Sequence, residues 1–404
     1  MKLLTFILAL LITLTLCLAG SLPQGAAESW KEFAVWPTTD DQEAPDIDGD
    51  IVVWQQFVEE YQDYDIYVAD MNSPDDLLAV IIDDANDQMS PAVFENIVVW
   101  QDYIASADWD ILAADISERQ QPVIFAVSNI FGNDEQFPAI HGNIVVWQDG
   151  AEGDYDIFGA DITDLASPAE FVVAAFEYDQ RRPAVYRNTV AWQDSFYGDE
   201  DILAADIWMR NKPAELGVTL EEFDQQRPAV WGDIVVWEDN YFGDMDIYAA
   251  DISDPNNPIE FAITANEAEQ TNPDIDRNIV VWQDNRNGNW DIYGYNLTTR
   301  QEFQITNNPH DQTNPAISGP FDSAQGEDLL HTERRRGTVV WEDNRDGNLQ
   351  IYAIVLDGPE VAQCKSKLAG DINGDCKVDF DDQAIMLSQW LECNLEPEEA
   401  CLPF

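Results

Sequence analysis

The chain has 404 residues, of which 45% are hydrophobic and 14 are tryptophan, so it is long and apolar enough to bury a large core. Its formal net charge is −59, from 78 acidic and 19 basic residues. A surface of this sign repels phosphate backbones and anionic lipid headgroups, which argues against nucleic-acid binding and against docking on anionic membranes. The charge indicates either a solvated acidic coat or a surface that collects divalent or cationic partners.

The N-terminus has the features of a secretory signal peptide. Lys2 precedes an apolar run over residues 3–19, and small residues follow. We expect residues 1–20 to form the signal, with cleavage between 19 and 27, and the mature protein to be secreted, held at the cell surface or periplasmic. Leu16 precedes Cys17 where a lipidated cysteine would need a small residue, so we predict export without lipidation. No later segment is apolar for long enough to form a transmembrane helix.

One short pattern recurs seven times after the signal. It reads Ile-Val-Val-Trp-Gln-Asp at 279–284, followed after a short loop by Asp-Ile-Tyr at 291–293. The seven tryptophans are spaced by 46, 47, 45, 45, 45 and 59 residues: Trp54, Trp100, Trp147, Trp192, Trp237, Trp282 and Trp341. A period in the forties, with several strand-like runs in each copy, is typical of a solenoid, a propeller or an array.

Each copy contains four predicted strands. An acidic-aromatic run, as at 302–305, is followed by a loop of the form Asp/Glu-Gln-x-x-Pro and by Pro-x-Ile/Val, as at 311–317. The Ile-Val-Val-Trp and Asp-Ile-Tyr runs are the other two, because β-branched and aromatic runs bounded by Gly, Asn, Asp and Pro are typical of strands. Asn287-Gly288 and Asp346-Gly347 lie between these last two runs, where a tight hairpin needs residues that tolerate positive φ.

Four strands in each of seven copies predict an all-β, seven-bladed propeller over residues 28–357. The phase of the repeat also predicts how the ring closes. Residues 32–35 match the acidic-aromatic strand that the last copy lacks, so this N-terminal strand should pair with residues 351–356 and remove two open sheet edges.

The repeat resembles that of TolB-type propellers, in which Pro-x-x precedes an Ile-Val-x-Trp-like strand and an Asp-Ile-Tyr strand follows a turn containing Gly. The resemblance covers residues 30–357. It implies binding of a protein or another ligand in the cell envelope or outside it, because one propeller class serves many unrelated roles.

The last copy departs from the repeat by about 14 extra residues between Ile317 and Thr338. This insertion contains His331 and the run Arg334-Arg335-Arg336. Two interpretations are open. The arginines could form weak surface ion pairs with acidic neighbours, or the loop could recognise carboxylates or sulfates.

The repeated aspartates could form a ring of metal sites, for example Asp284 with Asp291. Their recurrence in nearly every copy instead favours hydrogen bonds to their own hairpins. The acids of the Asp/Glu-Gln-x-x-Pro loops should lie on one face near the channel mouth, where they either brace loops or form a binding face: Asp41, Asp87, Asp179, Asp224, Asp311 and Glu269.

Catalytic candidates are few. The chain has three histidines, His141, His310 and His331, and none has a metal-ligand spacing. Carboxylate pairs of the glycosidase type are too numerous for one to be singled out. The copies look nearly identical, without the non-repeating polar residues expected at a catalytic channel. We therefore expect a protein that is not an enzyme.

The tail at 358–404 holds a calcium-loop motif. Counting Asp371 as position 1 places oxygen ligands at positions 1, 3, 5, 9 and 12, with a backbone carbonyl at 7: Asp371, Asn373, Asp375, Asp379, Asp382 and, through its carbonyl, Lys377. Cys376 replaces the usual Gly at position 6 and Asp382 the usual Glu at 12. Residues 380–391 have helical periodicity. We expect one calcium ion here; the alternative is a metal-free turn.

This tail resembles one half of a dockerin module, in which Asp at position 12 is normal. Dockerins have two such loop–helix units and this tail has one, which places binding to a cohesin-type partner in doubt. Four cysteines, all in this tail of an exported chain, predict two local disulfides with three possible pairings: Cys364, Cys376, Cys393 and Cys401.

The sequence thus predicts an exported, non-catalytic binding or assembly protein. Its propeller would recognise an extracellular or envelope protein or polysaccharide, and its calcium-loop tail would attach it to a larger structure. The alternative is a secreted polysaccharide-degrading enzyme, a lyase or glycosidase, that carries the tail as a targeting module.

Overall fold

The computed structural model describes residues 31–71, 86–103, 108–119, 121–128, 133–150, 153–196, 198–220, 222–264, 266–319 and 336–357. The predicted signal peptide, residues 320–335 of the predicted insertion, the calcium loop at 371–382 and the cysteines of the tail lie outside these residues. No helix among the described residues is long and apolar enough to cross a lipid bilayer.

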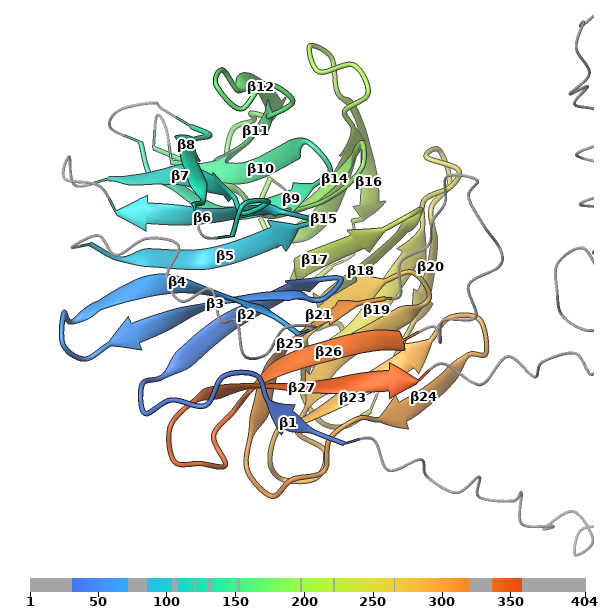
Figure 1. Ribbon diagram of the computed structural model, residues 1–404. Coiled ribbons are helices and arrows are strands. Elements are labelled where there is room, and N and C mark those ends of the chain that lie inside the picture. Colours follow the sequence, from blue (N-terminus) through green and yellow to red (C-terminus); the bar gives the residue numbers. More distant parts are fainter. Residues whose placement is uncertain are drawn as a thin grey trace, which may run out of the picture. The chain divides into compact units, whose positions relative to one another are not determined.

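Seven antiparallel sheets are arranged radially around one axis, which confirms the predicted seven-bladed propeller (Figure 1). The innermost strands of blades 1 to 7 are β2 (Gln42–Asp48), β5 (Gln88–Phe94), β9 (Glu135–His141), β13 (Gln180–Tyr186), β17 (Gln225–Trp231), β21 (Gln270–Asp276) and β25 (Gln312–Ser318). The second strands are β3 (Ile51–Val58), β6 (Ile97–Tyr103), β10 (Ile144–Asp149), β14 (Thr189–Asp194), β18 (Ile234–Asp239), β22 (Ile279–Asp284) and β26 (Arg336–Asp343).

The third strands are β4 (Asp63–Asp70), β7 (Trp109–Asp115), β11 (Asp156–Asp161), β15 (Asp201–Asp206), β19 (Asp246–Asp251), β23 (Asp291–Asn296) and β27 (Gln350–Asp357). The outer strands of blades 2 to 6 are β8 (Val123–Ala126), β12 (Ala169–Ala174), β16 (Ala214–Thr219), β20 (Ile259–Ala262) and β24 (Gln301–Gln304). The described part of blade 1 has three strands; a fourth would fall in 72–85, outside the described residues.

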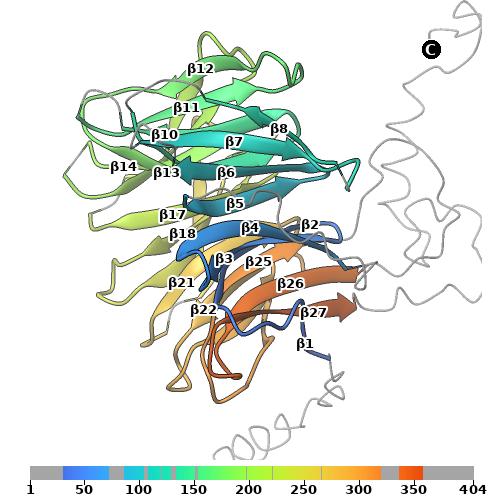
Figure 2. The ribbon, with the colours of Figure 1, turned by 60° about the vertical axis from the view of Figure 1, so that its left-hand side comes forward.

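The N-terminal strand closes the ring as predicted. β1 (Phe33–Ala34) pairs antiparallel with β27, with Phe33 opposite Ala353 and Ala34 opposite Tyr352. The next amide, of Val35, donates to the carbonyl of Ile351 at 2.8 Å. Both views of the ribbon show β1 beside β27, so residues from the two ends of the propeller complete one blade (Figures 1 and 2).

The core lies between neighbouring blades. All seven repeat tryptophans are fully buried, and Trp100 of blade 2 packs in one cluster with Val53, Ile66 and Val68 of blade 1. Its indole nitrogen donates to Asp102 at 3.1 Å. A sheet of four strands cannot bury both faces alone, so each blade depends on its neighbours for stability.

A ring of hydrogen bonds also joins the blades. In every inner strand, the residue before the repeated proline has φ between 48° and 52°, and the pairing register shifts there, as in a β-bulge. The amide of each such residue donates to the Gln or Glu after the tryptophan of the preceding blade at 2.7–3.2 Å. The seven pairs are Ala44–Glu342, Ser90–Gln55, Phe137–Gln101, Arg182–Gln148, Arg227–Gln193, Asn272–Glu238 and Asn314–Gln283.

The acids of the Asp/Glu-Gln-x-x-Pro loops brace the propeller. Each accepts a hydrogen bond from a backbone amide of the preceding blade, near the start of its third strand; for example, Asp311 accepts from Trp290 and Asp87 from Tyr64. The others are Asp41, Asp179, Asp224 and Glu269. In blade 3 the loop reads Asp-Glu-x-x-Pro, and its Asp134 accepts in the same way from the amide of Trp109. Of the two interpretations of these loops, the structure therefore supports bracing.

Candidate ligand-binding cavity

A cavity of about 1130 Å³ lies on the propeller axis. It is lined by the ends of the inner strands and by the turns that join each inner strand to the second strand of its blade. The third residue after the repeated proline lies in this lining and varies among the blades, with Asp in two of them: Asp48, Phe94, His141, Tyr186, Trp231, Asp276 and Ser318. The fold therefore places seven variable positions around one space.

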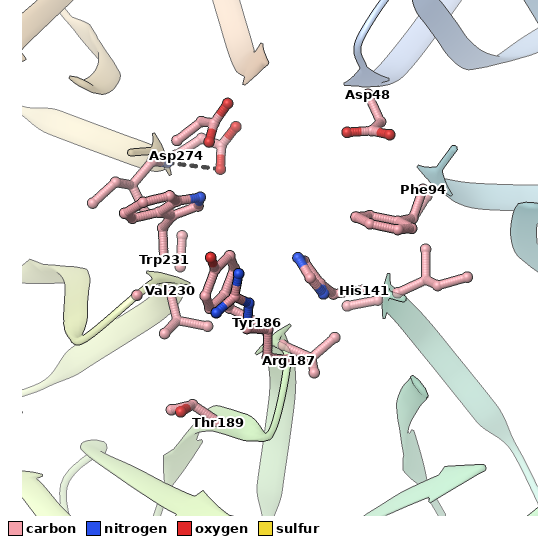
Figure 3. A pocket seen from close by; sticks show the side chains of 18 of the residues that line it. Asp48, Phe94, His141, Tyr186, Arg187, Thr189, Val230, Trp231 and Asp274 are labelled. Atoms are coloured by element: carbon pink, nitrogen blue, oxygen red, sulfur yellow. Dashed lines mark hydrogen bonds between the residues drawn. The ribbon is translucent and has the colours of Figure 1, made fainter. Parts of the chain in front are cut away.

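Four of these residues form an aromatic arc, which we define as Phe94, His141, Tyr186 and Trp231 of blades 2 to 5. The ring centroids are 4.4 Å apart for Phe94 and His141, 4.5 Å for His141 and Tyr186, and 5.1 Å for Tyr186 and Trp231. Figure 3 shows the four side chains around the open centre of the cavity. Tilted contacts at these distances stabilise each other, so the arc is a preformed apolar surface.

His141 acts in this arc as an uncharged ring. Burial and, as a smaller cause, the nearby Arg187 guanidinium lower its pKa to about 4. At neutral pH the imidazole is therefore neutral and adds to the apolar surface without adding positive charge.

The opposite side of the cavity is acidic. Blades 1 and 6 both carry Asp-Ile-Asp after the repeated proline, and we call Asp46, Asp48, Asp274 and Asp276 the acidic wall. Asp48 and Asp276 accept hydrogen bonds from the backbone amides of Glu95 and Gly319 in the following blades. Figure 3 shows Asp48 and Asp274 across the opening from the middle of the aromatic arc.

Asp46 and Asp274 are the most perturbed members of the acidic wall. Burial raises the pKa of Asp46 to about 6 and that of Asp274 to about 7. Asp46 accepts a 2.8 Å hydrogen bond from the amide of Val93, and Asp274 accepts two 2.8 Å bonds, from the amides of Ile317 and Ile275. These bonds partly offset the effect of burial on the two pKa values.

The fold does not require an acid at these two positions. The equivalent residue in the other five blades is alanine: Ala92, Ala139, Ala184, Ala229 and Ala316. Perturbed carboxyls in a cavity are typical of functional sites, because burying a charge there lowers the stability of the fold at neutral pH.

This cavity corrects one expectation. We expected the copies to be nearly identical and to lack non-repeating polar residues at the channel. This expectation is wrong, because the first and third residues after the repeated proline vary among the blades. The signal is present in the sequence, because Asp-Ile-Asp occurs in two copies and an aromatic residue or His in four. The repeated proline lies nine residues before the repeated tryptophan in blades 1 to 6, so aligning these copies on either residue brings the variable positions together.

Two other kinds of site were predicted from the sequence: the repeated aspartates and the calcium loop. Within the described residues, no group of three His, Cys, Asp or Glu side chains is placed to hold a metal ion. Asp284 accepts hydrogen bonds from its own hairpin amide at Arg286 and from the Trp282 indole, so the structural interpretation of this repeated aspartate is confirmed. The calcium ligands Asp371, Asn373, Asp375, Lys377, Asp379 and Asp382 lie outside the described residues and remain a prediction.

No family model and no curated protein matches the chain. A puromycin-hydrolyzing peptidase from Mycobacterium tuberculosis is 12% identical over 78% of this chain and 51% of the peptidase, with a TM-score of 0.58. An oligogalacturonate lyase from Vibrio parahaemolyticus is 11% identical over 83% of this chain and 95% of the lyase, with a TM-score of 0.56. This chain thus spans about half the length of the peptidase and nearly all of the lyase.

TolB from Acinetobacter baumannii is 13% identical over 79% of each chain, with a TM-score of 0.43, too low to carry an argument. At these identities, likeness to solved structures shows the fold alone. The propeller fold predicted from the repeat is confirmed. The peptidase and the lyase do not distinguish the two predicted functions, because one propeller fold serves many unrelated roles.

Proposed function

We propose that this protein is an exported, non-catalytic recognition protein that binds a glycan in its central cavity. The observation that carries the proposal is the two-sided lining of the cavity: the aromatic arc on one side and the acidic wall on the other. Ligand sites usually combine a large apolar surface with a few convergent polar groups, and this cavity has that composition.

A sugar ring matches both sides. Its C–H face is apolar and slightly positive, so it stacks on the electron-rich face of Tyr186 or Trp231. Its hydroxyls donate hydrogen bonds, and the carboxyl oxygens of Asp46 and Asp274 can accept them. The acidic wall repels anionic sugars, so the proposed ligand is a neutral or amino-containing glycan. A basic peptide is the competing ligand that the experiment must distinguish.

The test is a glycan array probed with the mature protein, followed by calorimetric titration of the strongest ligand. Trp231→Ala and Tyr186→Ala should each weaken binding by about two- to tenfold, since such stacking is worth about 0.5–1.5 kcal/mol. The matched control is Phe242→Ala, which removes a 65% exposed aromatic outside the cavity lining. Tight binding of lysine-rich peptides without glycan binding would contradict the proposed ligand class.

One observation favours the enzymatic alternative, a secreted lyase or glycosidase. Asp46 and Asp274 are two carboxyls with raised pKa facing one cavity, and glycosidases use such pairs as acid and base. New reducing ends or unsaturated uronate absorbance, produced by the wild type and lost in Asp46→Asn and Asp274→Asn, would establish this alternative. Glu135→Gln is the control, because it removes a buried acid outside the cavity lining.

The proposal includes the C-terminal tail as a calcium-dependent attachment module. The supporting observation is the spacing of Asp371, Asn373, Asp375, Asp379 and Asp382. Mature protein and a version ending at Gly358 would be used to capture partners from extracellular and envelope fractions, with calcium and with chelator. A partner lost on truncation and on chelation supports attachment through the tail. A partner kept by the truncated protein would place recognition on the propeller.

A further inference from the structure

A second pocket, of about 360 Å³, lies at another level of the propeller axis. It is lined by the seven repeated prolines and by the residues before them, which we call the pre-proline ring: Ala44, Ser90, Phe137, Arg182, Arg227, Asn272 and Asn314. Pro183 lines both this pocket and the central cavity, so the two spaces are neighbours. The hydrogen bonds between blades fix the backbone at each member of the ring.

Two adjacent members of the pre-proline ring are arginines. Arg182 lies with its guanidinium carbon 4.5 Å from the centroid of the Phe137 ring. Within the described residues its guanidinium makes no ion pair or hydrogen bond, and its pKa is lowered by burial and by Arg227. In a chain with 78 acidic and 19 basic residues, two neighbouring cations on the axis are unusual. A partly buried guanidinium without an acceptor is stabilised by an anion that approaches it.

The other members of the pre-proline ring make the pocket asymmetric, with hydrogen-bonded side chains on one side and small residues on the other. Arg227 donates to Asn272, Asn272 donates to Asn314, and Asn314 donates to Glu342 at 2.7 Å. These side chains therefore hold one another in place. Ala44 and Ser90, on blades 1 and 2, are the small members of the ring and leave space across from the arginines of blades 4 and 5.

One internal acid partly balances this charge. Glu238 lies 3.6 Å from Arg227, measured between Oε1 and Nε, and also accepts the amide of Asn272. Burial raises the pKa of Glu238. Glu238 forms its ion pair with Arg227 and attracts the Arg182 guanidinium without pairing with it, so the guanidinium of Arg182 is still available to a ligand.

We infer that the pre-proline ring binds a single carboxylate group, held by Arg182 with support from Arg227. Guanidinium groups bind carboxylates through paired hydrogen bonds, which neutral amides and Lys do not reproduce. The acidic surface repels ligands with many charges, so we expect one carboxylate on a small molecule. It comes from a sugar acid or from a simple organic acid. This site differs from the proposed glycan site in position and in the sign of its charge.

The experiment titrates galacturonate, propionate and galactose into the full mature protein by calorimetry. Galacturonate should bind more tightly than propionate if the carboxylate comes from a sugar acid, and equally if it comes from a simple acid; galactose should not bind at this site. Arg182→Gln should weaken carboxylate binding by about tenfold or more, and Arg182→Lys should restore only part of it. Raising NaCl from about 50 to about 300 mM should weaken binding, because salt screens the attraction.

Two controls keep the result interpretable. Arg300→Gln removes the same charge at an exposed hairpin residue and should leave carboxylate binding unchanged. Phe242→Ala, outside the linings of both spaces, should also leave it unchanged. If the wild type binds neither carboxylate, or if Arg182→Gln binds as the wild type does while retaining its melting temperature, the inference is overturned.

Discussion

The raised pKa of Asp274, in the central cavity, makes the stability of the fold depend on pH. Its pKa is raised from 3.8 to about 7 by burial, so the folded state binds a proton that the unfolded state releases between these values. Stability from this group is therefore fully present near pH 4 and is lost as the pH rises through 7. Asn at this position keeps an acceptor for the amide of Ile317 and removes the buried charge.

We therefore predict that Asp274→Asn is stabilised relative to the wild type as the pH rises. Between about pH 4.5 and pH 8, the difference in unfolding free energy between variant and wild type should grow by about 2–4 kcal/mol. Chemical denaturation at a series of pH values measures it. Parallel pH profiles for the two proteins would contradict the raised pKa and weaken the case for a functional acid.

At the scale of the strands, hydrogen bonds join each inner strand to the preceding blade. Gln148, on β10, is 3% exposed and accepts the amide of Arg182, on β13, at 3.1 Å. Gln148→Ala would leave that buried amide without its acceptor. We predict a loss of about 1–3 kcal/mol in unfolding free energy, measured by chemical denaturation.

Gln136→Ala is the matched control for this prediction. Gln136 accepts only a 3.4 Å bond from the side chain of Gln148, within the same blade, so its loss leaves the bond between blades intact. We expect an effect below about 1 kcal/mol. Equal losses for the two variants would mean that the bond to Arg182 contributes little.

At the scale of the whole molecule, closure of the ring depends on β1. Val35→Pro removes the amide that donates to Ile351 and weakens the pairing of β1 with β27. We predict a melting temperature lower by several degrees and more aggregation, because the edge of blade 7 becomes exposed. Val35→Ala keeps the amide and should have the smaller effect. A melting temperature unchanged by proline would show that β1 does not hold the ring closed.

The sequence predicted the architecture because each blade repeats the same local pattern. Trp282 and its equivalents mark the buried second strands, and residues 32–35 supply the strand that blade 7 lacks. The aromatic arc and the acidic wall could not be predicted in the same way. Phe94 and Trp231 are 137 residues apart in the chain, and only closure of the ring brings their blades around one axis.

The most direct test of non-catalytic recognition is to recover the bound glycan. The strongest ligand from the array would be incubated with stoichiometric mature protein and analysed by mass spectrometry, alongside Trp231→Ala. We predict that the wild type retains the glycan, that Trp231→Ala releases it, and that the glycan is recovered intact. Cleaved glycan would contradict the absence of catalysis, and equal retention by both proteins would contradict recognition in the central cavity.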